Sequence, residues 1–145
     1  MVTNLSTGAG VVPHIPALRF GEEYFSLDVN EVTRVNSDDV VARVSMANPG
    51  LVKRDLMRLD EARQALRRIP AADLVEMAKQ AGEYFFHDDL PLGDGVQSPE
   101  DYLNQLHATS GLPHSLIRMN MKKLYQLFSE MGGILKGLSR GLDLD

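Results

Sequence analysis

The four histidines are the first residues to consider for chemistry, because the 145-residue chain contains no cysteine. One histidine opens the triplet His87-Asp88-Asp89, and imidazole and carboxylate groups are both common metal ligands. A catalytic metal needs at least three protein ligands that converge on it, which adjacent loop residues do not supply. The triplet therefore favours a solvated acidic loop over a small metal-dependent enzyme.

The other histidines offer no clearer site. His14 lies in an N-terminal segment without periodicity. His107 and His114 stand on either side of a break at Gly111-Leu112-Pro113, so helical spacing cannot be used to bring them together. We expect two surface or hinge histidines at this break.

Motifs for a nucleophile or a phosphate site are also missing. Ser110 precedes Gly111, but no Gly-x-Ser-x-Gly surrounds it and the sequence places no base beside it. The glycines of Gly8-Ala9-Gly10 and Gly93-Asp94-Gly95 neither follow a buried strand nor open a helix. The run Tyr84-Phe85-Phe86 has no interleaved basic residues, which favours core or interface packing over base stacking. The sequence thus assigns no catalytic, cofactor-binding or metal-binding residue to this chain.

Composition excludes several classes of protein. Hydrophobic residues make up 43% of the chain, enough for a folded core, and the net charge of −5 does not suggest a nucleic-acid binder. No apolar run approaches the roughly 18–20 residues that a membrane span needs, and no basic leader precedes an apolar core as in a secretory signal. With the absence of cysteine, these features predict a soluble cytoplasmic protein.

Charge is divided between two neighbouring segments. Residues 70–107 carry eight acidic residues and a single basic one, Lys79. Residues 51–69 carry the basic residues Lys53, Arg54, Arg58, Arg63, Arg67 and Arg68 against the acids Asp55, Asp60 and Glu61. The basic segment could bind phosphate or an acidic partner, but a solvated helix face beside an acidic neighbour is the favoured interpretation.

The N-terminal third reads as β structure. Residues 1–15 are expected to form a loose arm, and residues 16–47 a β-hairpin region. A first hairpin is expected to turn at Gly21-Glu22, and a second pairs residues 29–35 with residues 40–46.

The remainder, residues 51–141, shows helical periodicity. The expected helices cover about residues 51–69, 71–86, 99–109 and 114–138. The first is ended by Pro70 and the third is begun by Ser98, whose hydroxyl can cap a free amide. The first helix carries one apolar stripe, which consists of Val52, Leu56, Leu59, Ala62, Leu66 and Ile69. Residues 87–95, between the second and third helices, read as a loop rich in Gly, Pro and Asp.

The last helix has the strongest pattern. Its apolar stripe follows heptad spacing and consists of Ile117, Met121, Leu124, Phe128, Met131, Leu135 and Leu138. Each of these side chains contributes roughly 1.5–3 kcal/mol when fully buried, so the stripe is expected to pack on something large. Gly132-Gly133 interrupts the pattern and suggests a kink or a close backbone approach. The polar residues Glu130, Lys136 and Arg140 are expected on the solvent face.

The order of these features resembles the N-terminal portion of the aldehyde dehydrogenase superfamily, including its acyl-CoA reductase branches. The hairpin sequence "EVTRVNSDDVVARVSMANPG" is followed by a helix with "DEARQAL" and a helix beginning "IPAADLVEMAKQAGEYF". Then come an acidic helix, "TSGLPHSLIRMN" and the long last helix. The resemblance covers about residues 17–145, although each single motif is loose.

The resemblance implies a fold class and a parent enzyme. The chain would be mixed and mostly α, the N-terminal part of an α/β aldehyde-dehydrogenase-type fold without its dinucleotide-binding sheet. In the family, a cysteine thiolate attacks the aldehyde and hydride passes to NAD or NADP. The family's oxyanion asparagine, cofactor glycines, general-base glutamate and nucleophilic cysteine have no match here, so no residue role is carried over. The implied partner is the remainder of the parent polypeptide, whose sheet would begin near residues 142–145.

A rival interpretation comes from another class of protein. The chain could be a free-standing helical interaction or dimerisation module that uses the Ile117–Leu138 heptad face. A homo-oligomer is compatible with either interpretation. The substrate, the choice between NAD and NADP, and the choice between water and coenzyme A as acyl acceptor are not encoded in this chain.

Overall fold

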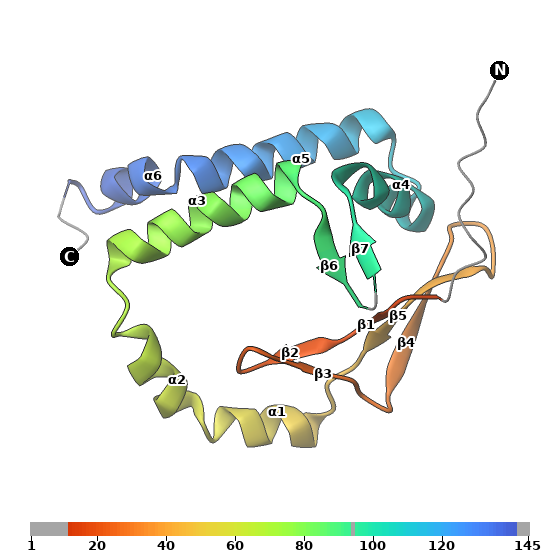
Figure 1. The fold of residues 1–145 in the computed structure, drawn as a ribbon, viewed down its shortest axis with the longest axis horizontal. Helices are drawn as coiled ribbons and strands as arrows, with labels where there is room; N and C mark the ends of the chain where they lie inside the picture. The colour runs from red at the N-terminus through yellow and green to blue at the C-terminus, as the bar shows by residue number, and fades with distance from the viewer. Residues whose placement is uncertain (1–11, 94, 142–145) are drawn as a thin grey trace.

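The computed structural model describes residues 12–93 and 95–141. These residues form a mixed α/β structure with six helices and three small sheets (Figure 1). Most of the expected N-terminal arm, including Gly8-Ala9-Gly10, lies outside the described residues, as do Asp94 and residues 142–145.

The largest sheet is built on the second predicted hairpin, which is confirmed. Strand β4 (Val29–Thr33) pairs antiparallel with β5 (Val40–Ser45). The expectation that residues 1–15 form a loose arm is wrong at the last two residues, because β1 (His14–Ile15) pairs parallel with the other edge of β5. A side-chain contact fastens this strand, since His14 Nε2 lies 2.9 Å from Ser45 Oγ.

The first hairpin is also present, but it turns one residue earlier than expected. Strands β2 (Ala17–Arg19) and β3 (Glu22–Tyr24) flank Phe20-Gly21, not Gly21-Glu22. Both turn residues have positive φ angles, 52° for Phe20 and 85° for Gly21. A two-residue hairpin loop of this hand matches the right-handed twist of its strands.

The expected helix over residues 51–69 is wrong as a single element. The segment forms α1 (Pro49–Leu56) and α2 (Leu59–Leu66), separated where Arg58 leaves helical geometry with φ −101° and ψ 11°. The apolar stripe of this segment is exposed, so no packed layer holds its two halves in line. Instead, the Arg58 guanidinium lies 4.2 Å from the centre of the Phe20 ring.

The expected loop at residues 87–95 contains a second small hairpin. Strands β6 (Leu90–Leu92) and β7 (Gly95–Gln97) pair antiparallel across it. Gly93, with φ 55°, lies so close to the N-terminal strand that a Cβ atom there would be 2.6 Å from the carbonyl oxygen of His14. The prediction of a loop is therefore wrong for residues 90–92 and 95, which lie in strands.

The two middle helices agree with the sequence. Helix α3 (Ala71–His87) and helix α4 (Pro99–Ser110) each match the expected span to within one residue. Ser98 forms the predicted cap, because its Oγ accepts a hydrogen bond from the Asp101 N–H at 3.1 Å. Gly111 ends α4 in the left-handed region with φ 72°.

The last expected helix is divided in two. Helix α5 (His114–Ser129) and helix α6 (Met131–Leu138) meet at Glu130, whose φ is −101°. The expected close approach near Gly132-Gly133 is confirmed for Gly132, where a Cβ atom would lie 3.3 Å from Cγ1 of Val75 on α3. Nothing lies within 4 Å of the equivalent position at Gly133.

The core lies where α3, α4 and α5 meet. Leu103, Ile117 and Met121 are its buried residues, and the residues packed around them are Phe85, Phe86, Tyr102, Leu106 and Leu112. In Figure 1, α5 and α6 run back along α3, while α1 and α2 lie at the opposite side of the molecule. Within residues 12–93 and 95–141, no helix combines the length and apolar character needed to cross a membrane.

Candidate functional site

His87 does not gather its acidic neighbours into a metal site. Its Nε2 lies 3.7 Å from Glu83 Oε2, one helical turn earlier on α3, rather than forming a group with Asp88 and Asp89. In the described part of the chain, no group of three or more histidine, cysteine, aspartate or glutamate residues could hold a metal ion.

The surroundings of His87 join α3 to α5. The Tyr125 hydroxyl donates a hydrogen bond to Glu83 Oε1 at 2.9 Å, and the Tyr125 ring stacks on Phe86 with 4.9 Å between centroids. The hydrogen bond to Glu83 raises the pKa of Tyr125, and burial and the Glu83 charge add to the shift. This arrangement holds the phenol in its neutral form and fastens two helices together.

His107 and His114, which sequence spacing could not bring together, are in contact. Their rings meet edge to face with 4.4 Å between centroids. His107 Nδ1 lies 2.8 Å from the carbonyl oxygen of Leu112, and since a carbonyl only accepts, Nδ1 carries the hydrogen. The left-handed turn at Gly111 produces this contact by reversing the chain. The pair fits the expected hinge histidines.

Ser110 has a structural role at the same turn. Its hydroxyl donates to the carbonyl oxygen of Leu106 and accepts from the Leu112 N–H at 3.2 Å. Both contacts satisfy backbone groups at a helix end. Among the residues that the structure describes, no base is hydrogen-bonded to this hydroxyl, so the geometry gives it no nucleophilic activation.

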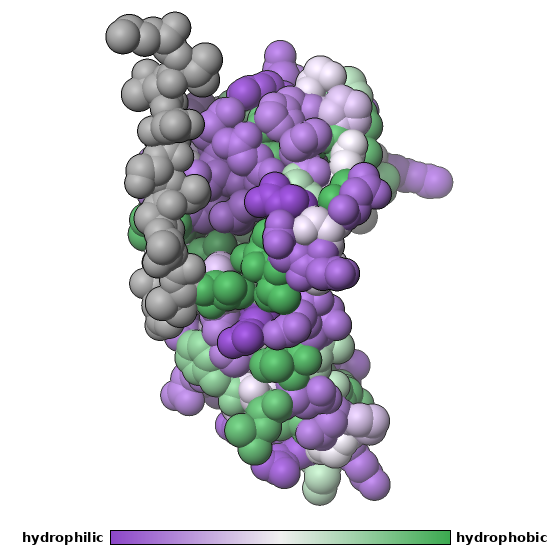
Figure 2. All heavy atoms as spheres, turned by 90° about the vertical axis from the view of Figure 1, so that its right-hand side faces the viewer, coloured by the Kyte–Doolittle hydropathy of each residue, from purple (hydrophilic) through white to green (hydrophobic). Residues whose placement is uncertain are grey.

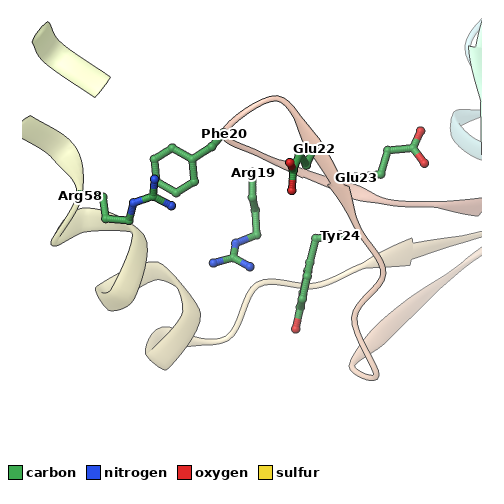
Figure 3. A pocket seen from close by; sticks show the side chains of 6 residues that line it. All are labelled: Arg19, Phe20, Glu22, Glu23, Tyr24 and Arg58. Carbon is green, nitrogen blue, oxygen red and sulfur yellow. The ribbon is translucent and has the colours of Figure 1, made fainter. Parts of the chain in front are cut away.

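A polar hollow of about 340 Å³ lies beside the first hairpin (Figure 3). Its lining residues are Arg19, Phe20, Glu22, Glu23, Tyr24 and Arg58. The Arg19 Nε donates to Asp55 Oδ2 at 2.7 Å, and the Arg19 guanidinium lies 4.9 Å from the centre of the Tyr24 ring. Arg58 is paired with Glu61 Oε2 at 3.1 Å. Both guanidinium groups are already paired, so the hollow is best explained as a clamp between the hairpin and α1.

The Arg19–Asp55 pair is the strongest electrostatic feature of this clamp. The hydrogen bonds from Arg19 lower the pKa of Asp55, and the charges of Arg19, Arg54 and Arg58 add to this effect against the opposing effect of burial. The same hydrogen bond raises the pKa of Arg19. The pair ties a hairpin to a helix that begins thirty residues later. Sequence reasoning missed it, and no local spacing could have found it.

An apolar groove of about 320 Å³ lies next to the clamp. We call it the α1–α2 groove, and its apolar lining consists of Leu18, Phe20, Val52, Leu56, Leu59 and Ala62. Four of these belong to the helical stripe that the sequence predicted. The stripe therefore forms as a surface, but the chain leaves it in solvent.

The last two helices carry two apolar faces. The predicted heptad stripe begins inside the molecule, since Ile117 is 0% and Met121 6% exposed against α3 and α4. A second stripe, which we call the outer stripe, consists of Asn120, Leu124, Leu127, Met131, Ile134 and Leu138. Its exposed apolar members are Leu124 at 41%, Leu127 at 44%, Ile134 at 37% and Leu138 at 77%, and the polar Asn120 is exposed as well.

The outer stripe was detectable in principle. Its spacings of 4, 3, 4, 3 and 4 satisfy the heptad rule as well as the predicted stripe does, and the two share Leu124, Met131 and Leu138. Testing each helical phase separately would have revealed a helix with two adjacent apolar faces. Exposed apolar residues occur elsewhere too, as Figure 2 shows on the side that carries α4 and the strands.

Comparisons of the chain with models of known protein families, with curated proteins and with solved structures found no match. Within the described residues, the titratable side chains form helix–helix and hairpin–helix contacts and no convergent acid, base and nucleophile. The α1–α2 groove and the outer stripe are instead exposed apolar surfaces.

Proposed function

We propose that this chain is the N-terminal scaffold of an NAD(P)-dependent aldehyde dehydrogenase or acyl-CoA reductase-like oxidoreductase. In this proposal it covers the dinucleotide-binding sheet and supplies no catalytic group. The outer stripe is the observation that carries the proposal, because four large apolar side chains stay in solvent after α3 and α4 have covered the inner face of α5. The order of sequence elements supplies the family.

The physical argument concerns what such a stripe fits. Parallel sheets in α/β proteins have both faces covered by helices, and each covering helix presents a continuous apolar stripe to the sheet. Helices α5 and α6 offer a stripe of this kind over residues 120–138. The thiolate chemistry and the hydride acceptor would be supplied by the remainder of the parent enzyme.

The first test reads the coding sequence beyond Asp145. The proposal expects an apolar strand there, then cofactor glycines and, far downstream, a cysteine in a small-residue loop. The corresponding longer protein should bind NADH or NADPH, and Leu127→Glu should weaken that binding through the disturbed sheet contact. A stop codon at this point, together with a chain that melts cooperatively and binds no hydrophobic dye, would overturn the proposal.

A second candidate function uses the same surface for dimerisation. Lys123 and Glu130 are seven residues apart in sequence, the spacing of one heptad, with Lys123 on α5 and Glu130 at the break between α5 and α6. In an antiparallel pair like positions face each other, which places each Lys123 opposite Glu130 of the second copy. Asn120, a polar residue within the stripe, is of the type that specifies register.

Light scattering after size-exclusion chromatography separates the two candidates. The dimer candidate expects a defined dimer that Lys123→Glu disrupts and that the double variant Lys123→Glu/Glu130→Lys restores. The scaffold proposal expects no effect of either variant on the mass of the chain.

A further inference from the structure

Two exposed apolar faces of this molecule lie on segments of opposite charge. The first is the α1–α2 groove, defined above. The second is the outward face of α3, which carries an exposed stripe at Leu74, Met77, Ala81 and Tyr84. We propose that the α1–α2 groove of one copy binds the outward α3 face of a second copy. This inference does not depend on the proposed function, because it uses neither the outer stripe nor any catalytic group.

The two apolar stripes cover equal numbers of residues in the sequence. On the groove side the stripe runs from Val52 to Ala62, and on α3 it runs from Leu74 to Tyr84. Each covers ten residue steps, which is about 15 Å along α3 at 1.5 Å per residue, whereas the groove stripe crosses the break at Arg58 between α1 and α2. Both stripes are exposed within the copy that carries them, and α1 and α2 are not packed on α3. Among the described residues, neither stripe is covered by the other.

The charges beside the groove are positive once internal pairing is taken into account. All three acids of the α1–α2 segment are engaged, because Asp55 pairs with Arg19, Glu61 with Arg58 and Asp60 with Arg63. Lys53 and Arg67 form no ion pair within the described part of the chain. Lys53 follows Val52 directly, which places it about 100° around α1 from the apolar stripe, and Arg67 is the C-cap residue of α2, beyond the groove lining.

The charges beside the α3 stripe are negative and equally unpaired. Asp73 and Glu76 are exposed and form no ion pair among residues 12–93 and 95–141. They directly precede Leu74 and Met77, so they border the stripe as Lys53 borders the groove. Apolar contact bordered by opposite charges is the arrangement that gives an interface both affinity and a defined orientation.

The contact is heterologous, because the two copies contribute different surfaces. A copy that offers its groove to one neighbour still has a free α3 face for another, so association continues beyond two copies unless it closes into a ring. Screening of the bordering charges should weaken it, since the Debye length falls from about 14 Å at 0.05 M salt to about 4 Å at 0.5 M.

The test uses the full chain and two charge-reversed variants. Lys53→Glu/Arg67→Glu reverses the groove edge, and Asp73→Lys/Glu76→Lys reverses the α3 edge. Analytical ultracentrifugation should show salt-sensitive self-association of the unmodified chain. Each variant alone should associate only at a protein concentration about tenfold higher or more. The reason is that the two reversed charges on one face then repel the like charges on the other face. An equimolar mixture of the two variants should associate again, since each reversed edge then meets a complementary one.

A matched control reverses two lysines elsewhere on the surface. Lys122→Glu/Lys136→Glu makes the same change in net charge as the groove variant, on helices that the proposal does not use. Circular dichroism of each variant verifies that it is folded before its mass is interpreted. The proposal is overturned by a chain that is monomeric at all concentrations, by equal effects of the groove and control variants, or by variants that fail to associate when mixed.

Discussion

Replacement of Ile117 by alanine tests whether the heptad stripe is buried against other elements of this chain. Ile117 is 0% exposed and packs with Leu103 and Met121 between α4 and α5. Leu138, at the other end of the same predicted stripe, is 77% exposed. Replacing each of these two residues by alanine therefore compares a buried site with an exposed site in the same predicted stripe.

The expected losses of stability differ severalfold. Ile117→Ala removes three carbon atoms, about 2.4 kcal/mol at about 0.8 kcal/mol for each buried carbon, and leaves a cavity that adds to this loss. Alanine's better helix propensity returns about 0.5 kcal/mol, so a net loss of about 2–4 kcal/mol is expected. Leu138→Ala exposes little that was buried, and its expected loss is about 0–0.5 kcal/mol.

Urea denaturation followed by circular dichroism measures both free energies of unfolding. Marginal domains have a total stability of about 5–15 kcal/mol, so the loss at Ile117 should shift the midpoint clearly while the loss at Leu138 should not. Equal effects at the two positions would refute the assignment of an inner and an outer face to this helix. The inner face of α5 would then also require a cover from outside the chain.

Three further outcomes follow from single contacts. Gly82→Ala should destabilise by about 1–3 kcal/mol in thermal unfolding, because its Cβ would lie 2.8 Å from Cβ of Phe128 on α5; a neutral result would mean that α3 and α5 are not in contact there. The free-energy difference between the unmodified chain and Asp55→Asn should be constant near neutral pH. It should shrink as the pH falls below the unfolded value of 3.8 through the lowered folded pKa, since a carboxyl with a lowered pKa stabilises only while it is ionised; a pH-independent difference would contradict the Arg19 pairing. Ser98→Ala should cost about 1 kcal/mol through loss of the α4 cap, whereas Ser98→Asp, which keeps an acceptor, should cost less.

Local chemistry accounts for the parts of the fold that sequence predicted well. The Ser98 cap and the Gly111 stop depend on groups within four residues of each other, and the α4 span between them was accordingly predicted to within one residue. The hairpin of β4 and β5 is of the same kind, with its turn and alternation contained in one short segment. Strand β1 was missed because a two-residue strand has no periodicity and exists only beside β5.

The breaks in two expected helices show a limit of prediction from helical periodicity. Periodicity continued through Arg58 and Glu130, so the sequence predicted one helix at each place. At Arg58 the chain bends where an aromatic ring of another element receives the guanidinium group. At Glu130 the bend precedes the glycine that approaches α3. Both bends lie next to contacts with other elements, which helical spacing does not include.

The candidate surfaces were also only partly predictable from the sequence. The sequence by itself determined that residues 51–69 and 114–138 carry apolar stripes and that charge changes sign between residues 51–69 and 70–107. Only the tertiary structure decided that the start of the last stripe is core, that the α1–α2 stripe remains uncovered, and that Arg19 reaches Asp55. Periodicity specifies which side chains share a face of a helix. Burial of that face depends on a second surface from a distant part of the chain. The spacing of residues along the sequence does not specify which surface packs there.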